Sequence, residues 1–197
     1  MRVIAGTARS LKLKTIEGLD TRPTTDRIKE TLFNMLQPEI HGAVILDLFS
    51  GSGAIAIEAL SRGAKEAVLV ENSRAACACI RENLAHTRLF DKALVMECDC
   101  ATAVNRLAGH EPFDIIFMDP PYGKGYEKII LEKLADCDFV DEYTTIVFET
   151  ALATDIEFVE QLGYSLLKVK EYKTNKHFFV SKTEKLQDSF LLNKKRD

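Results

Sequence analysis

The sequence of 197 residues lacks any apolar run that approaches the ~20 residues needed to span a membrane. Its first fifteen residues read MRVIAGTARSLKLKT, with several basic side chains but neither the apolar centre nor the cleavage site of a signal peptide. Internal repeats and low-complexity linkers are absent as well. Because 46% of the residues are hydrophobic, we expect a cytoplasmic protein without a membrane segment, built as one compact domain with a small appendage.

Cysteine is too scarce for a disulfide framework, because the chain has only five, an odd number. Two pairs, Cys77 with Cys79 and Cys98 with Cys100, show a C-x-C spacing that also occurs in metal sites. Each pair lies inside a segment with the pattern of regular secondary structure, and neither a histidine nor a C-x-x-C motif supports a metal. We therefore expect reduced thiols in a cytoplasmic protein and no bound metal.

Acidic residues are missing from the first sixteen positions, which hold the basic residues Arg2, Arg9, Lys12 and Lys14. Residues 168–197 hold nine basic residues against four acidic ones, whereas residues 31–167 hold ten against twenty-two. The net charge of −4 therefore conceals two basic ends on an acidic body. Such ends are typical of solvated surface when they stand alone, but two that meet in space favour a polyanionic partner.

Short apolar runs alternate with helical patterns from Val44 to about residue 162. The predicted strands cover residues 44–49, 67–71, 93–98, 114–119 and 144–149, and predicted helices separate them. Continuous apolar strands that alternate with helices are typical of parallel strands buried on both faces. Right-handed crossovers between such strands give an open, doubly wound sheet.

The two ends of the chain have different patterns. YSLLKVKEY at 164–172 alternates in polarity, turns, and returns as KHFFVSK at 176–182, which predicts an antiparallel hairpin. RVIAGTARSLKLKT predicts a basic hairpin, and RPTTDRIKETLFNML predicts an amphipathic helix capped by Thr24 or Thr25. We therefore expect an α/β fold, a doubly wound, seven-stranded, mostly parallel sheet. The expected division is 1–40 for the hairpin–helix extension, 41–183 for the sheet domain and 184–197 for a polar tail.

Acidic residues mark the carboxyl ends of four predicted strands. Asp47 lies late in the first strand, Glu71 ends the second, Asp99 follows the third, and Asp119 ends the fourth. Ligands of open parallel sheets bind at this edge, near the point where the strand order reverses. Four carboxylates gathered at one edge would repel one another in an inert protein, so they indicate a ligand-binding site.

A glycine-rich loop follows the first strand in DLFSGSG, residues 47–53. Its glycines let the backbone approach a ligand and open a helix, and Glu71 lies at a spacing typical of an acid that binds a ribose. NAD and S-adenosylmethionine both fit these features. Asp47 would repel a pyrophosphate but attract an ammonium group, and Asp99 can accept a hydrogen bond from an adenine amine. These two acids favour S-adenosylmethionine.

The stretch FMDPPY, residues 117–122, ends an apolar run with a carboxylate, two prolines and an aromatic ring. The amine of an aromatic base is a poor nucleophile, because its lone pair is delocalised into the ring. Hydrogen bonds from its two N–H groups to Asp119 and to the carbonyl of Pro120 localise that lone pair, and Pro121 stiffens the backbone. Tyr122 offers a face on which a flipped base can stack. Strand termination alone explains the prolines but not Asp119 and Tyr122.

These motifs resemble those of a known family. DLFSGSG, VE at 70–71, Asp99 and DPPY resemble the class I S-adenosylmethionine-dependent methyltransferases of amino groups. RPTTDRIKETLFNML with DLFSGSGAIAIEALSRGA resembles more narrowly the RsmD family, over about residues 1–182. Members of that family methylate the exocyclic 2-amine of a guanine in bacterial 16S ribosomal RNA. The resemblance implies a Rossmann-like fold, S-adenosylmethionine as cofactor, and 16S ribosomal RNA or an assembling small ribosomal subunit as partner.

The expected site residues fall into three groups. The expected cofactor-binding residues are Asp47, Phe49, Ser50, Gly51, Ser52, Gly53, Glu71, Asn72, Asp99, Cys100 and, from the resemblance, Thr24. The expected catalytic residues are Asp119, Pro120, Pro121 and Tyr122. The residues expected to contact RNA are Arg2, Arg9, Lys12 and Lys14 and, from the resemblance, Arg22 and Arg27.

Two other functions stay open at this point. DNA adenine methyltransferases also use DPPY, although a small chain without a separate recognition domain argues against sequence-specific reading of DNA. A noncatalytic RNA-binding protein on the same fold is the other, and the intact glycine loop and DPPY argue against it. A dehydrogenase is disfavoured by Asp47 and by the lack of an obvious acid–base partner for hydride transfer.

Overall fold

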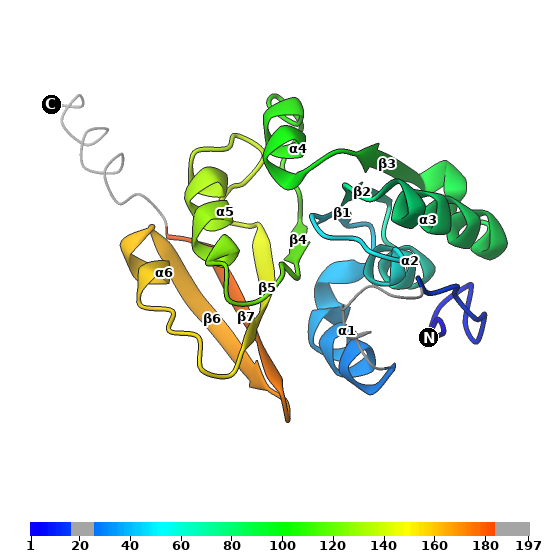
Figure 1. Cartoon of the computed structure of the whole chain (residues 1–197), viewed down its shortest axis with the longest axis horizontal. Helices are drawn as coiled ribbons and strands as arrows, with labels where there is room; N and C mark the ends of the chain where they lie inside the picture. The colour runs from blue at the N-terminus through cyan, green and yellow to red at the C-terminus, as the bar shows by residue number, and fades with distance from the viewer. Residues whose placement is uncertain (17–25, 184–197) are drawn as a thin grey trace, which may run out of the picture.

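The computed structural model describes residues 1–16 and 26–183 and shows one twisted sheet with helices on both sides (Figure 1). The strands are β1 Val44–Asp47, β2 Glu66–Glu71, β3 Ala93–Glu97, β4 Ile115–Met118, β5 Thr145–Ala151, β6 Tyr164–Glu171 and β7 Asn175–Lys182. The helices are α1 Asp26–Ile40, α2 Ala54–Ser61, α3 Arg74–Thr87, α4 Cys100–Arg106, α5 Tyr126–Ala135 and α6 Phe158–Gln161, with a 3-10 turn at Phe90–Lys92. Arg22, Thr24, Thr25 and the predicted tail 184–197 lie outside the described residues.

The seven strands follow the order β3-β2-β1-β4-β5-β7-β6. Strands β1 to β5 pair in parallel, and β7 pairs antiparallel with both β5 and β6. The order reverses between β1 and β4, which places the switch point of the sheet at the centre. The predicted fold class, a doubly wound and mostly parallel sheet with an antiparallel C-terminal hairpin, is confirmed.

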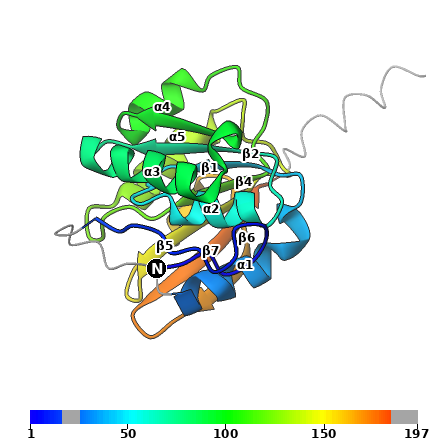
Figure 2. The ribbon, with the colours of Figure 1, turned by 90° about the vertical axis from the view of Figure 1, so that its right-hand side faces the viewer.

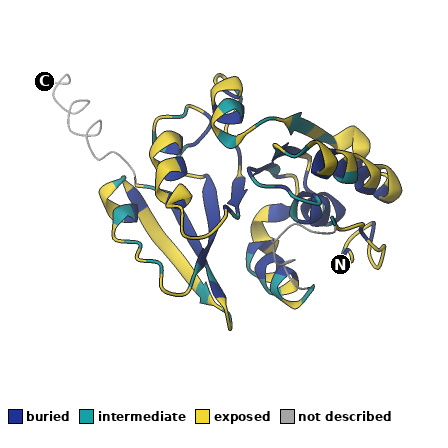
Figure 3. Ribbon diagram, viewed as in Figure 1, coloured by how far each residue is buried: buried dark blue, intermediate teal, exposed yellow. Residues whose placement is uncertain are grey.

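Successive residues of the central strands point to opposite faces of the sheet and feed two separate apolar clusters. Ile45 joins a buried cluster with residues of α1, α2 and α3, whereas its neighbour Leu46 joins one with residues of α4, α5 and α6. Figure 2 shows the first three helices and the N-terminal segment in front of the strands. Figure 3 shows the central strands β4 and β5 mostly in the colour of buried residues. Burial on both faces explains why the central strands are apolar throughout.

The two strands at the switch point, β1 and β4, are each two residues shorter than the sequence suggested. The first was predicted over 44–49 but ends at Asp47, and the fourth was predicted over 114–119 but ends at Met118. In the first of these the apolar pattern continues past the last strand residue, because Leu48 is buried beneath the turn. The early ends leave Phe49 and Asp119 in loops at the carboxyl edge of the sheet.

The predicted N-terminal hairpin folds back on itself but forms no regular strands. One antiparallel bridge joins Arg2 and Lys12, and the residues between them are mostly turns. Gly6 adopts φ +84°, and a Cβ atom there would lie 1.7 Å from the carbonyl oxygen of Ser61 in α2. The segment therefore turns tightly against α2 in a way that only glycine allows, and this contact prevents a regular ladder.

A buried carboxylate holds the N-terminal segment to the helices. Glu58 of α2 accepts hydrogen bonds from the backbone N–H groups of Ile4 at 2.8 Å and Ala5 at 3.0 Å. It also lies 3.1 Å from Nζ of Lys29 in α1 and 2.8 Å from Nε of Arg62. Burial lowers the pKa of Lys29, while Glu58 favours its charged form. Glu58 therefore joins α1, α2 and the N-terminal segment in one network.

Replacing Glu58 by glutamine should destabilise the protein by about 3–5 kcal/mol, because the buried cations of Lys29 and Arg62 lose their counter-charge. Urea unfolding followed by circular dichroism measures this change. Glu66→Gln is the matched control, because its ion pair with Lys65 is exposed and should contribute less than ~1 kcal/mol. Equal stability of the two variants would contradict a structural role for the Glu58 network.

Candidate active site

The loop after β1 crosses the carboxyl edge of the sheet and is held by backbone hydrogen bonds. Leu48 donates its N–H to the carbonyl of Phe117 at 2.9 Å, and Ser50 donates to the carbonyl of Val70 at 3.0 Å. These bonds fix the loop over β4 on one side and β2 on the other. The loop thus lies across the switch point, where the sequence analysis expected the cofactor site.

The two glycines of this loop have different constraints. Both have positive φ angles, 52° at Gly51 and 78° at Gly53. A Cβ atom at Gly53 would lie 3.2 Å from the side chain of Leu69 and 3.4 Å from that of Ile80, so packing against β2 and α3 also disfavours a larger residue there. A Cβ atom at Gly51 would meet no atom within 4 Å. The backbone of Gly51 therefore borders open space, which suits close approach of a ligand.

Glu71, at the end of β2, ties the glycine loop to the next turn. Its two carboxylate oxygens accept hydrogen bonds from the N–H of Gly51 at 2.9 Å and from the N–H of Ser73 at 2.8 Å. Each oxygen keeps a lone pair that the two hydroxyls of a ribose can use. Asn72 follows it in an exposed position. The arrangement agrees with the predicted ribose-binding role, which stays a prediction.

The surroundings of Asp47 indicate most clearly that the site binds a ligand. Only 1% of the residue is exposed, and neither carboxylate oxygen has a hydrogen-bond partner among the described residues. Burial raises the pKa of Asp47 from 3.8 to about 7. A buried carboxyl without a partner is costly to fold around, so the chain carries a group here that a cation would stabilise.

Asp99 has a structural role that the sequence analysis missed. It caps α4, where one oxygen accepts from the N–H of Thr102 and the other from its hydroxyl, both at 2.8 Å. The backbone hydrogen bond of Thr102 is the main cause that lowers the pKa of Asp99. Cys100 is the first residue of that helix and is half-buried. The predicted contact of Asp99 with an adenine amine, which stays a prediction, would thus be made by a carboxylate that already caps a helix.

The DPPY loop lies beside Asp47, because β4 pairs with β1 at the centre of the sheet. Asp119 is half-buried, Pro120 is buried, and the residue Tyr122 is 45% exposed. Burial raises the pKa of Asp119, and the carboxylates of Glu149, Asp47 and Glu127 raise it further. The charge of the predicted cofactor acid, Asp47, therefore acts on the predicted catalytic acid, Asp119, across the switch point.

Two residues that the sequence analysis did not single out complete this part of the site. The hydroxyl of Tyr122 donates a short hydrogen bond to Glu149 of β5, and Glu149 is bound by Nε2 of His177 of β7 at 2.8 Å. Burial opposes the charge of Glu149, but the hydrogen bonds from His177 and Tyr122 outweigh it and lower its pKa. Glu149 carries the same sequence signal as the other acids, an acid late in a predicted parallel strand. His177 carries none that points to a site.

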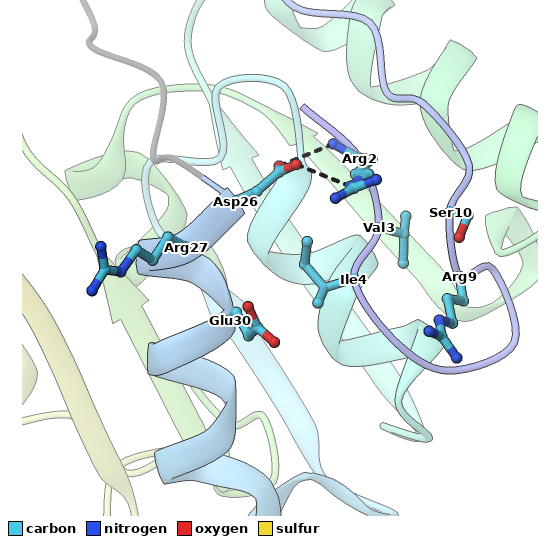
Figure 4. Close-up of a pocket in the computed structure, with 8 residues that line it drawn as sticks. All are labelled: Arg2, Val3, Ile4, Arg9, Ser10, Asp26, Arg27 and Glu30. Atoms are coloured by element: carbon cyan, nitrogen blue, oxygen red, sulfur yellow. Dashed lines mark hydrogen bonds and ion pairs between the residues drawn. The ribbon is translucent and has the colours of Figure 1, made fainter.

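Some of the residues predicted to contact RNA line a cavity beside the N-terminal segment. Arg2, Arg9 and Arg27 help to line a cavity of about 630 Å³ together with Val3, Ile4, Ser10, Asp26 and Glu30. Figure 4 shows Arg2 facing Asp26, 3.2 Å from it, while Arg27 extends away from Arg2 and Arg9. Lys12 is exposed, and Lys14 forms an ion pair with Glu82. The charge of Lys14 is thus partly engaged within the protein.

The described part of the chain offers neither a cluster of metal ligands nor a membrane-spanning helix. Within residues 1–16 and 26–183, no three His, Cys, Asp or Glu side chains gather in a way that could hold a metal ion. No helix in that part of the chain is both long and apolar enough to cross a membrane. The five cysteines form no disulfide.

Asp47→Asn should stabilise the ligand-free protein at pH 8 by about 2–4 kcal/mol and have little effect at pH 4. The folded state keeps the proton of Asp47 up to about pH 7, whereas the unfolded chain releases it near 3.8, so the wild type loses stability as pH rises between these values. Urea unfolding at both pH values measures the effect. Asp91→Asn, at an exposed aspartate, should leave the pH dependence unchanged. A destabilised Asp47→Asn variant at pH 8 would mean that the carboxylate has a partner in the protein.

Comparison with known proteins identifies the family. Residues 1–181 match the family model described as Conserved hypothetical protein 95. The chain is 36% identical to ribosomal RNA small subunit methyltransferase D of Escherichia coli strain K12, over 81% of this chain and 79% of that protein. It is 32% identical to the protein of the same name from Haemophilus influenzae, over 86% of this chain and 88% of that protein.

Solved structures agree with these matches. The Escherichia coli protein yhhF, described as a candidate methyltransferase, superposes with a TM-score of 0.79 at 33% identity, over 93% of this chain and 98% of that chain. A Thermus thermophilus protein superposes with a TM-score of 0.77 at 26% identity, over 92% of this chain and 99% of that one. The resemblance seen in the sequence is therefore confirmed, and the chain belongs to the RsmD family of methyltransferases, whose model is described as Conserved hypothetical protein 95.

Proposed function

We propose that this protein transfers a methyl group from S-adenosylmethionine to the exocyclic 2-amine of a guanine in 16S ribosomal RNA, displayed on an assembling small ribosomal subunit. Methylation of ribosomal RNA is supported by the relatives named ribosomal RNA small subunit methyltransferase D. The observation that carries the proposal is the buried carboxyl of Asp47, which has no hydrogen-bond partner among residues 1–16 and 26–183, beside Asp119 at the switch point. One acid suits a cation, and the other follows a strand and precedes two prolines.

The residues present fit S-adenosylmethionine. Its ammonium group supplies the counter-charge that Asp47 lacks, its ribose matches the two oxygens of Glu71, and Gly51 leaves room for it. When bound, the cofactor supplies a methyl group on a positively charged sulfur. A phosphate-bearing dinucleotide fits worse, because its pyrophosphate would face the carboxyl of Asp47. The acid positions therefore favour a cationic ligand.

Asp119 and Pro120 suit the activation of an aromatic amine. The carboxylate of Asp119 accepts one N–H of the amine and the carbonyl of Pro120 accepts the other, which localises the nitrogen lone pair toward the methyl group. Asp119 must be charged for this, and a nearby positive charge lowers the pKa that burial and neighbouring acids have raised. Holding amine and methyl group in line removes about 7–11 kcal/mol of the barrier by proximity and orientation.

The charge distribution supports a ribonucleoprotein substrate rather than bare RNA. The exposed cations Arg9 and Lys12 lie on the N-terminal segment, whereas the carboxyl edge carries at least three acids close together. A polyanion gains few phosphate contacts from such a surface, so affinity for free RNA should be modest. A partly assembled subunit adds protein and folded RNA contacts that the basic segment lacks.

Asp119→Ala should abolish methyl transfer, by at least about a hundredfold, while S-adenosylmethionine still binds, because Asp119 is assigned to the target amine. Glu71→Ala should instead weaken the binding of S-adenosylmethionine, by ~1.5–3 kcal/mol. Isothermal calorimetry and single-turnover transfer of a tritiated methyl group measure the two effects separately. Near-normal turnover by Asp119→Ala would refute the proposed activation of the amine.

The double variant Arg9→Gln with Lys12→Gln should weaken RNA binding and lower the slope of log affinity against log salt by ~0.7–0.9 for each phosphate that the variant no longer neutralises. Point changes are preferable to deletion of residues 1–16, because Val3, Ala8 and Leu13 belong to the core. Lys65→Gln, at an exposed lysine on another loop, is the matched control. An unchanged slope would remove the N-terminal segment from the RNA interface.

The substrate itself is tested by methyl transfer into small-subunit particles, protein-free 16S ribosomal RNA and duplex DNA, followed by nucleoside analysis. The proposal expects 2-methylguanosine, formed best on particles. Methylated adenine from duplex DNA would instead assign a DNA adenine methyltransferase, and no transfer to any substrate would favour a noncatalytic RNA-binding protein.

A further inference from the structure

A line of hydrogen-bonded side chains runs from the DPPY loop into the sheet. The hydroxyl of Tyr122 donates to Oε1 of Glu149, and Oε2 of Glu149 lies 2.8 Å from Nε2 of His177. The other ring nitrogen of His177 lies 3.3 Å from the hydroxyl of Tyr172, whose ring meets that of His177 edge to face. Glu149 and His177 are direct partners in the antiparallel pairing of β5 with β7. Four side chains from separate segments therefore act as one unit.

This line joins the protein interior to an exposed ring. His177 is fully buried and Glu149 is 6% exposed, whereas Tyr122 is 45% exposed at the carboxyl edge. His177 also meets the ring of Phe117 edge to face, which fixes its orientation from the β4 side. Among these residues, Tyr122 is the most exposed, and it is held from within by buried groups.

Stability alone does not explain the buried pair of Glu149 and His177. A buried polar pair is often no more stabilising than two apolar residues of similar volume, because both groups must leave water. An apolar side chain already borders this position, since the ring of Phe117 meets that of His177 edge to face. The acceptor oxygen of Glu149 has a use that an apolar residue cannot supply, which is to bind the hydroxyl of Tyr122.

The loop that carries Tyr122 needs such a tie. Two glycines follow, Gly123 with φ 75° and Gly125 with φ 66°, and neither has an atom within 4 Å of a Cβ position. This part of the loop is therefore exposed and unpacked on its outer side. Without the hydrogen bond to Glu149, the ring of Tyr122 would be free to turn, and an aromatic platform that turns loses much of its value for stacking.

We propose that Glu149 and His177 are positioning residues that hold the Tyr122 ring against β5, so that it presents a fixed face to the target base. This rests on the proposed function, because it assigns Tyr122 to stacking on a nucleobase. Glu149 binds the hydroxyl, and His177 holds Glu149 in the orientation that allows this. The hydroxyl is consequently engaged within the protein, and the substrate meets the face of the ring.

A double-mutant cycle of Tyr122→Phe and Glu149→Gln tests the coupling. Each single variant should lower kcat/KM for RNA by about ten- to hundredfold, with the dissociation constant of S-adenosylmethionine unchanged within about twofold. In the Tyr122→Phe background, Glu149→Gln should cost less than about twofold more, because the charge-assisted hydrogen bond that it weakens is already gone. Multiplicative losses would overturn the proposal, since they would mean that Glu149 acts independently of Tyr122.

Trypsin cleavage after Lys124 tests the same tie without any activity measurement. Lys124 is exposed and lies two residues after Tyr122, so loosening the loop should speed this cut severalfold in native protein. Tyr122→Phe and Glu149→Gln should both speed it, and Tyr143→Phe, at a tyrosine that is 82% exposed, should not. Mass spectrometry identifies the cut. An unchanged rate in Tyr122→Phe would show that the hydroxyl does not hold the loop.

The two assays separate the two hypotheses. If the wild type transfers no methyl group to any nucleic acid, the proposed function fails, while the trypsin assay still decides whether Glu149 holds Tyr122. If the wild type is active and the cleavage rate rises but the kinetic losses multiply, the role of the tie in catalysis is refuted. Faster cleavage together with losses that do not multiply is the result that the proposal expects.

Discussion

The burial of several carboxyl groups at one edge of the sheet is the constraint to which the rest of the structure responds. Asp47 is buried without a hydrogen-bond partner among the described residues, Asp119 stands among three other acids, and the charge of Asp47 helps to raise the pKa of Asp119. Such a cluster opposes folding, because like charges repel and each loses its water. Of Asp47, Asp119 and Glu149, only Glu149 has a lowered pKa, because hydrogen bonds from His177 and Tyr122 outweigh the effect of burial. A cationic ligand would remove the largest part of the remaining cost.

The interactions that offset the folding cost of these buried acids lie elsewhere in the molecule. Two apolar clusters cover both faces of the sheet. Glu58 joins α1, α2 and the N-terminal segment by binding Lys29, Arg62 and the N-terminal backbone. The strand order then determines which acids meet, because β1 and β4 are neighbours although α2, α3 and α4 lie between them in the chain. Stability and function are therefore assigned to different parts of one fold, a common division when a site stores unfavourable charge.

The sequence predicts those features that depend on local pattern. Apolar runs separated by helices predicted the parallel sheet, and acids at strand ends predicted Asp47, Glu71 and Asp119 at one edge. The pairing of Glu149 with His177 was out of reach, because it depends on the antiparallel register of strands far apart in the sequence. The helix cap of Asp99 was overlooked although Thr102 follows three residues later, because a strand-end acid fits the cofactor pattern equally well.

The acids at this edge fall into two groups: Asp47 and Asp119, whose charge the protein does not balance, and Glu149, whose charge it does. On the proposed function, the positive charges that Asp47 and Asp119 need are brought by the cofactor, and the positive charge on sulfur disappears when the methyl group leaves. The ammonium group assigned to Asp47 would keep its charge, so only the charge nearer the methyl group would be lost, which would weaken the hold on the spent cofactor and favour its release. Glu149 does not take part in this change, because His177 and Tyr122 stabilise its charge throughout. The cluster can therefore respond to the charge of the cofactor while the ring of Tyr122 stays in place.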